Sequence, residues 1–301
     1  MVYLHRMDRF IDNISAFLAS EGFNCSHQTR NGLEVISAPL SSGRTKVILP
    51  LCIASDSPAA AKEQSDVVAE CIETLEEYPL IVTQDRWNTQ MKMMQCRILA
   101  HLEVFSPIYA RNCEVRKIDK ALAKKFLEEN HSYGHAACRY CYGLYFKRHT
   151  GHIAQAESSS DAIVPGQLIA VATFSNARKW IKGEKTIRSY EWTRYASLPQ
   201  VRLSGGMGRL LKAFIKEVSP DDIMSYADLE WSEGSVYQQL GFELEDRKDP
   251  VMFAVDSDWK RTPLKRDEAD SITVPELELT DTLFFQNFGS NKYRLKLTDY
   301  K

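Results

Sequence analysis

One helix of the chain begins with Gly205-Gly206-Met207-Gly208-Arg209, shortly after a predicted strand, and continues as an amphipathic segment to Val218. Glycine lets the backbone approach a ligand closely and adopt dihedral angles that other residues avoid. The N–H groups of a helix's first turn have no partner within the helix and bind phosphate groups well, and Arg209 adds a cation there. The run predicts either a phosphate-binding helix start or, as in many glycine clusters, only a tight turn.

A second motif follows after one further predicted strand, Ile223 to Ala227. It reads Tyr237-Gln238-Gln239-Leu240-Gly241-Phe242 and resembles the Y-x-x-L-G-F signature of the GNAT N-acyltransferases, which lies after their fifth strand. The two motifs stand in the family's order with a matching alternation of strands and helices. Together they are more specific than either one alone, and the resemblance covers roughly Tyr109 to Val255.

The resemblance implies transfer of an acyl group from acetyl-CoA or another acyl-CoA to an amine on a small molecule or a macromolecule. It implies that Tyr237 protonates the departing thiolate. Glu191, in a predicted strand, could accept the amine proton through water, with Asp228 as a rival in the same cleft. The implied cofactor-binding set is Arg202, Gly205, Gly206, Met207, Gly208 and Arg209. The chain departs from the family at Leu203, where Gln or Arg usually stands three residues before the first glycine of G-x-G.

Two of these residues also have plain structural interpretations. Tyr237 could be a helix tyrosine packed under the last strands. Glu191 could form a buried ion pair with Arg188 or Arg194. The sequence is compatible with a catalytic and a structural role for each.

The order of the predicted elements indicates the α/β class. The second half reads β-α-β-β-β-α-β-α-β, which favours a GNAT-like mixed central sheet flanked by helices. The first half reads helix, strands, helix, strand and helix, a smaller α/β module whose last helix is predicted from Arg86 to Phe105 because Met91, Met94 and Ile98 recur at helical spacing. We expect domains at 1–106 and 107–256, and a tail at 257–301 partly docked on the core.

Three further segments resemble the C-terminal region of uncharacterised phage and mobile-element proteins, in which a restriction-type nuclease domain precedes that region. They are Ala110 to Arg116, Phe126 to His131, and Ser225 to Asp228 with Trp231-Ser232. The first half is compatible with such a nuclease core, but a nuclease needs clustered carboxylates and a lysine to hold divalent metal. Glu34 and Lys46 are the only obvious candidates and lack the usual spacing, so we expect a degenerate nuclease-like or simple α/β module.

One hypothesis is a zinc site built from His131, His135, Cys138 and Cys141, because zinc takes His and Cys ligands. The two cysteines fall at the start of a predicted strand, Cys138 to Phe146. There an odd separation should point them to opposite faces. We therefore expect no metal and interpret the cysteines as buried thiols.

Cations interleave with aromatic residues between Arg178 and Tyr190, a pattern that suits nucleic acid but more often marks a solvated loop. The whole chain of 301 residues has a net charge of −2, so it has no global basic field. Seven cysteines, no signal peptide and no apolar stretch long enough for a bilayer predict a cytoplasmic protein without a membrane partner. The alternative function is a non-catalytic or base-modifying, nucleic-acid-associated protein of mobile-element type with a repurposed GNAT fold.

Overall fold

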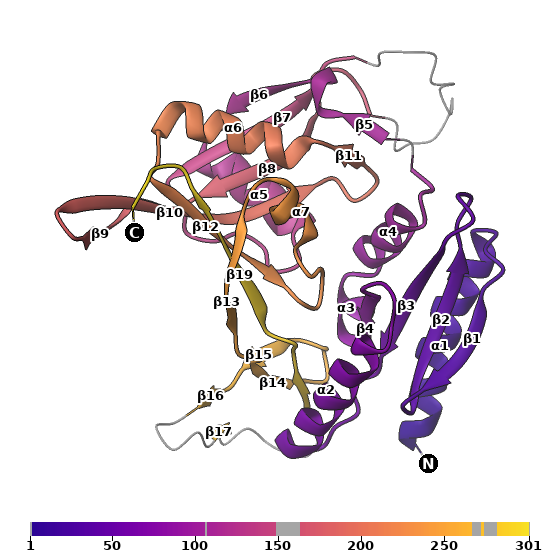
Figure 1. The fold of residues 1–301 in the computed structure, drawn as a ribbon. Helices are drawn as coiled ribbons and strands as arrows, with labels where there is room; N and C mark the ends of the chain where they lie inside the picture. Colours follow the sequence, from indigo (N-terminus) through magenta and orange to yellow (C-terminus); the bar gives the residue numbers. More distant parts are fainter. Residues whose placement is uncertain (1, 106, 149–162, 267–271, 274–281, 301) are drawn as a thin grey trace. The chain divides into compact units, whose positions relative to one another are not determined.

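The computed structural model describes the chain except residues 1, 106, 149–162, 267–271, 274–281 and 301, and only the backbone of residues 2–8. The stretch from Arg148 to Gly166 is rich in Ser and Ala and predicts a polar loop, most of which lies outside the described residues. The chain forms two compact units, each built from several segments (Figure 1). The first contains residues 1–103, 227–234 and 246–291, and the second contains 104–226, 235–245 and 292–301.

The first unit is built on a four-stranded sheet in the order β1-β2-β3-β4, antiparallel except for the parallel pair β3–β4. Its strands and helices up to residue 103 are α1 (Val2–Ser20), β1 (Ser26–Arg30), β2 (Leu33–Pro39), β3 (Thr45–Leu51), α2 (Pro58–Glu73), β4 (Leu80–Thr83), α3 (Gln84–Thr89) and α4 (Met91–His101). Later segments add β14 (Met252–Val255), β15 (Arg261–Pro263), β16 (Lys265–Arg266), β17 (Ile272–Thr273) and β18 (Leu283–Gln286).

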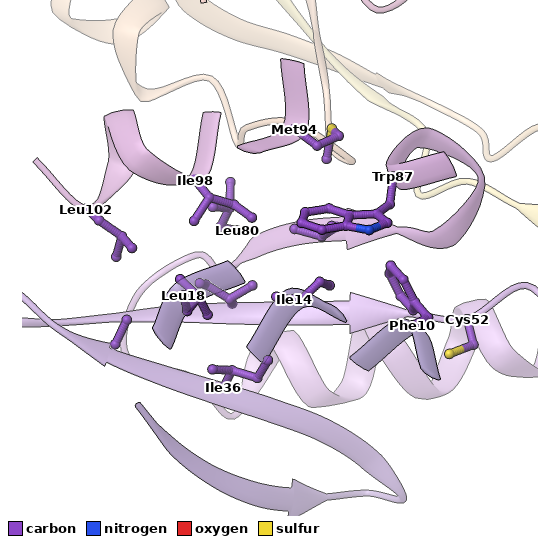
Figure 2. Packing of buried hydrophobic residues seen from close by; sticks show 13 residues of the cluster. Phe10, Ile14, Leu18, Ile36, Cys52, Leu80, Trp87, Met94, Ile98 and Leu102 are labelled. Carbon is purple, nitrogen blue, oxygen red and sulfur yellow. The ribbon is translucent and has the colours of Figure 1, made fainter. Parts of the chain in front are cut away.

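Both faces of this sheet are covered at β2, β3 and β4, whereas β1 is exposed along its whole length. Successive strand residues point to opposite sides. Ile48 of β3 packs into the cluster on one face, and the next residue, Leu49, packs into the cluster on the other. On the first face, α1 presents residues four apart, which lie on one side of a helix. Figure 2 shows these residues, Phe10, Ile14 and Leu18, directed towards the strands and towards Trp87.

The long helix predicted from Arg86 to Phe105 is wrong. The chain forms α3 and α4, separated at Gln90, whose backbone dihedral angles (φ −133°, ψ 38°) are not helical. Met94 and Ile98 of the predicted apolar face are buried, and so is Leu102, but Met91 is 47% exposed. The periodicity of apolar residues indicates which face of a helix is buried. It does not reveal a single non-helical residue that separates two helices.

The second unit confirms the predicted α/β class and the alternation β-α-β-β-β-α-β-α-β. Its elements are β5 (Pro107–Tyr109), the 3-10 helix η1 (Ala110–Asn112), β6 (Cys113–Lys117), α5 (Lys120–Asn130), β7 (Tyr140–Phe146), β8 (Leu168–Phe174), β9 (Arg178–Lys182), β10 (Lys185–Ser197), β11 (Arg202–Ser204), α6 (Gly206–Val218), β12 (Asp222–Asp228), α7 (Ser235–Gln239), β13 (Glu243–Lys248) and β19 (Ser290–Lys296). The mixed sheet has the order β13-β19-β12-β10-β8-β7-β6, with β9 paired to β10.

Two helices cover opposite faces of this mixed sheet (Figure 1). On one face, Phe214 of α6 stacks on Phe174 of β8 with ring centroids 3.9 Å apart. On the other, Phe126 and Leu127 of α5 pack on strand residues. Asp119 caps α5 by accepting a hydrogen bond from the amide of Leu122 at 2.7 Å. Among the described residues, no helix is both long and apolar enough to span a bilayer.

Candidate active site

Strands β10 and β12 run parallel and stay paired over a short stretch. The ladder joins Ser189 to Asp222, and it ends where Glu191 faces Met224. Beyond that point β10 continues to Ser197 and β12 to Asp228. Just beyond the ladder a side chain joins the two strands: the Ser225 hydroxyl donates a hydrogen bond to the Trp192 carbonyl oxygen at 3.1 Å. The carboxyl ends of parallel strands lie at one edge of a sheet, which is where ligands bind in α/β proteins.

Helix α6 begins at the same edge, because the chain reaches it from the carboxyl end of β10 through a short segment that contains β11. The intervening β11 is held by parallel pairing with β5, with Leu203 opposite Ile108. Gly205 is the N-cap with φ +75°, a conformation that favours glycine. A glycine cap has no side chain to bind the first-turn amides, so they remain available to a ligand. Arg202 and Arg209 are both exposed beside this helix start.

Two of the three glycines also have a packing reason. A Cβ on Gly206 would lie 2.4 Å from Cδ2 of Leu203, and one on Gly208 would lie 3.0 Å from Cδ2 of Leu240. Leu203, the residue that departs from the family pattern, therefore packs against the helix start. The cation Arg202 stands next to it on the exposed side of the short strand. Met207 is half-buried between the glycines.

Tyr237 lies on α7 with its hydroxyl 2.9 Å from the Ser225 hydroxyl, at the point where the β10–β12 ladder has ended. Its ring stacks on Tyr293 with centroids 5.3 Å apart and meets Trp192 edge-on. Burial raises the pKa of Tyr237, although the contact with Ser225 acts in the opposite direction. Tyr237 therefore carries its proton at neutral pH. Both interpretations of this residue apply at once, since it is packed among aromatic rings and still presents a hydroxyl at the end of the ladder.

Glu191 lines a cavity of about 450 Å³ on the other face of the sheet. The walls come from the loop after α5, the loop between β8 and β9, the first residue of β9, and residues within β10 and β12. They include Ala137, Cys138, Ser175, Asn176, Ala177, Arg178, Ser189, Glu191 and Met224. The alternative ion pairs for Glu191 are not formed: Arg188 pairs with Asp221 at 3.2 Å, and Arg194 donates to the carbonyl groups of Gly134 and Thr193. Within the described residues the half-buried Glu191 thus lines the cavity without an ion pair. Its charge still acts on Arg194, because burial lowers the pKa of Arg194 and Glu191 acts in the opposite direction.

Glu191 and Tyr237 approach the end of the ladder from opposite sides of the sheet. Met224 lines the cavity together with Glu191, whereas the next residue of β12, Ser225, contacts Tyr237. Successive residues of a strand point to opposite faces. Tyr237 is on the face covered by α6. Its neighbour Trp192 stacks on Phe174, and Phe174 in turn stacks on Phe214 of α6.

Asp228 lies in the first unit, where its carboxylate accepts a hydrogen bond from the amide of Glu230 at 2.9 Å. The sequence places a second carboxylate, Glu230, just beyond Asp228 as another rival for the acid–base role, but Glu230 is 1% exposed and inaccessible to a substrate. It contacts Arg86 and forms an ion pair with Arg261 at 2.6 Å.

This buried cluster of charges was missed from the sequence. Arg261 bridges Glu230 to Asp85, with Nη2 donating to Oδ1 of Asp85 at 2.9 Å, and Thr83 lies 3.3 Å from the Glu230 carboxylate. Its members come from residues 83–86, 230 and 261, so no local spacing links them. Burial acts to raise the pKa of Glu230, but Arg86 and Arg261 outweigh it and lower that pKa to about 2.

The expectation that Cys138 and Cys141 point to opposite faces is wrong. Their sulfur atoms lie 3.5 Å apart. The strand begins at Tyr140, so Cys138 stands before it and the alternation of a strand does not apply. His135 contacts Glu128 instead of a cysteine. Within the described residues, no group of three or more His, Cys, Asp or Glu side chains is arranged to hold a metal ion.

Glu34 and Lys46, the residues considered for a nuclease centre, are engaged separately. Glu34 pairs with His27 at 2.9 Å, and Lys46 donates to the Tyr78 carbonyl oxygen at 2.8 Å. Burial lowers the pKa of Lys46, although Glu77 acts against it. The two side chains belong to different contacts, so they do not form the acid–lysine pair that such a centre needs.

No family model matches the chain. No curated protein matches it. Among solved structures, Eis1 from Mycobacterium abscessus is 14% identical with a TM-score of 0.33 over 47% of this chain, which spans 33% of Eis1. An acetyltransferase of the GNAT family from Bacillus anthracis is 12% identical with a TM-score of 0.29, covering 62% of this chain and 95% of that one. A KacTA–DNA complex is 17% identical with a TM-score of 0.28, covering 58% and 92%. Likenesses this distant carry no functional argument.

Proposed function

We propose that the second unit transfers an acyl group from acetyl-CoA or another acyl-CoA to an amine. The observation that carries the proposal is the convergence at the end of the β10–β12 ladder. The open start of α6 lies at that edge, Tyr237 reaches it from the α6 face, and Glu191 reaches it from the cavity. An acyl-CoA suits this arrangement, because it has anionic phosphates at one end for the helix start and a thioester at the other end for Tyr237 and Glu191.

The cofactor's pyrophosphate would lie at the first-turn amides of α6, where the helix dipole favours negative charge. Arg202 and Arg209 would add charge-assisted contacts. Met207 and the neighbouring glycines would form the wall of that site. In this arrangement the thioester is directed to the opening between β10 and β12.

The chemical step follows from the two groups at the ladder's end. The amine nitrogen attacks the thioester carbonyl carbon, a C–N bond forms and the C–S bond breaks. The proton lost by the amine goes to Glu191, directly or through water, and the departing thiolate takes a proton from Tyr237. The products are an amide and free coenzyme A. Asp228, which belongs to the first unit, is not needed in this scheme.

Thermal unfolding with acetyl-CoA tests the proposal. At a hundredfold excess over Kd, binding should raise Tm by about 5 to 10 °C. Replacing both Arg202 and Arg209 by Gln should remove most of that shift, whereas Lys212→Gln, an exposed cation farther along α6, should not. The absence of a shift at millimolar acetyl-CoA would refute the proposal.

The alternative, a nucleic-acid-associated protein, rests on the β9–β10 hairpin. Lys182 faces Lys185 across its strands, a repulsive pair that an anionic partner would relieve. However, Trp180 is the aromatic residue of β9 that would have to stack on a base, and its ring packs edge-on against Tyr300 with centroids 5.5 Å apart. The same unfolding assay discriminates between the two functions: a single-stranded oligonucleotide, in place of acetyl-CoA, would raise Tm if the alternative holds.

A further inference from the structure

The cavity beside Glu191 carries two unlike charges on one face of the sheet. Arg178 of β9 is the cross-strand partner of Ser189 on β10, so both side chains point to the same face. Glu191 lies two residues beyond Ser189 and shares that face. All three line the cavity. Diagonal neighbours of this kind have backbones about 7 to 8 Å apart, which places a guanidinium and a carboxylate on the walls of a single small space.

The two serine hydroxyls of the cavity are already engaged with the protein. The Ser175 hydroxyl donates to the Asn176 carbonyl oxygen at 2.8 Å and accepts from the Glu191 amide at 2.9 Å. The Ser189 hydroxyl donates to Asp222. By contrast, within the described part of the chain neither the Arg178 guanidinium nor the Glu191 carboxylate forms an ion pair. These two groups remain to receive a ligand.

Each group selects a different part of a ligand. A carboxylate accepts hydrogen bonds from an ammonium group, which becomes the attacking amine once it has lost its proton. A guanidinium is a planar fork of donors that matches a carboxylate or a phosphate. A cavity of about 450 Å³ lies within the range for small-molecule sites, about 300 to 1,000 Å³.

We infer that the acceptor is a small primary amine that also carries an anionic group, as an amino acid or an amino phosphate does. Glu191 holds the amine and Arg178 holds the anionic group. The inference rests on the proposed acyl transfer and deepens it, because it assigns the substrate class of the same site. Arg178 is a specificity-determining residue here, since it binds the acceptor at a distance from the reacting atoms.

Matched acceptor pairs give the test. With acetyl-CoA, release of free thiol is followed for lysine against cadaverine, which lacks only the carboxylate, and for phosphoethanolamine against ethanolamine. The anionic member of at least one pair should have a kcat/KM about tenfold to a hundredfold higher, the range expected for one charged hydrogen-bonded contact. Which pair shows the difference tells a carboxylate from a phosphate.

Variants locate the effect. Arg178→Gln should raise KM by about tenfold or more for the acceptor that carries the anionic group, and it should leave KM unchanged for the partner that lacks this group. Arg178→Lys should retain part of the preference. Lys182→Gln, an exposed cation on the same strand that does not line the cavity, should behave as wild type. Equal rates for both members of each pair, or an Arg178→Gln enzyme with an unchanged preference, would overturn the inference while acyl transfer stands.

Direct calorimetric titration of the full-length protein with the same four amines separates the two proposals. Binding of lysine or phosphoethanolamine that is lost in Arg178→Gln and in Glu191→Gln supports the assigned pocket even if acetyl-CoA has no effect, in which case only acyl transfer fails. If acetyl-CoA binds and turns over but neither anionic amine binds in preference to its partner, the assigned acceptor class is wrong.

Discussion

The buried charge cluster of the first unit and the cavity of the second unit use the same residue types in opposite ways. In the cluster, Glu230 is 1% exposed, contacts Arg86 and pairs with Arg261, so its charge is neutralised inside the fold. In the cavity, Glu191 and Arg178 share a wall without pairing to each other. A carboxylate whose partners are supplied by the protein holds segments together, and one that faces open space is available to a ligand.

Among the substitutions that test this comparison, a change at Glu230 should have the largest effect, and that effect is on the stability of the fold. Glu230→Gln removes a charge and leaves two arginines buried beside it, and breaking a buried pair in this way costs about 3 to 5 kcal/mol. The free energy of unfolding, measured with urea, should fall by that amount. Asp66→Asn, which breaks the exposed pair with Lys62, should change it by less than about 1 kcal/mol.

Acid unfolding checks the same cluster. The pKa of Glu230 is about 2 in the folded protein and near the ordinary value of about 4.3 in the unfolded chain. A lowered folded pKa contributes stability that is fully present above the unfolded value and is lost as pH falls through the folded one. Wild type should therefore lose more stability than Glu230→Gln between about pH 5 and 2. Parallel curves for the two proteins would show that Glu230 is not charged in the cluster.

Tyr237→Phe should have the next largest effect, and it acts on function rather than folding. The substitution keeps the ring stacked on Tyr293 and removes the hydroxyl beside Ser225. If Tyr237 protonates the thiolate, kcat should fall by a factor on the order of a hundred or more. The acetyl-CoA shift in Tm should stay close to wild type. A wild-type turnover rate would make Tyr237 a packing residue only.

Alkylation of Cys138 should give the smallest and most local effect. Cys138 lines the cavity and is half-buried. Cys141 is buried, and its burial together with the neighbouring Cys138 raises the pKa of the Cys141 thiol to about 12. The thiolate is the reactive form, so iodoacetamide should label Cys138 well before Cys141. A bound acceptor amine should slow that labelling several-fold, as followed by peptide mass spectrometry. Unchanged labelling at saturating acceptor would place the amine elsewhere.

The sequence by itself determined the elements and motifs that depend on neighbouring residues. The glycine start of α6, the Asp119 cap of α5 and the alternation of strands and helices all follow from local preferences for dihedral angles and hydrogen bonds. Such signals extend over only a few residues, so one sequence is enough to show them.

Only the tertiary structure decided which distant residues meet. The cluster of Asp85, Glu230 and Arg261 joins three segments that no spacing connects. The pairing of Arg178 with Ser189 depends on strand register, and a shift of one residue would turn Arg178 away from the cavity. The separate register of β10 on β12 places Ser225 just beyond the end of the ladder, where its hydroxyl meets Tyr237. These contacts arise because long-range packing fixes the register of strands, and that information is spread over the whole core rather than over any short run of residues.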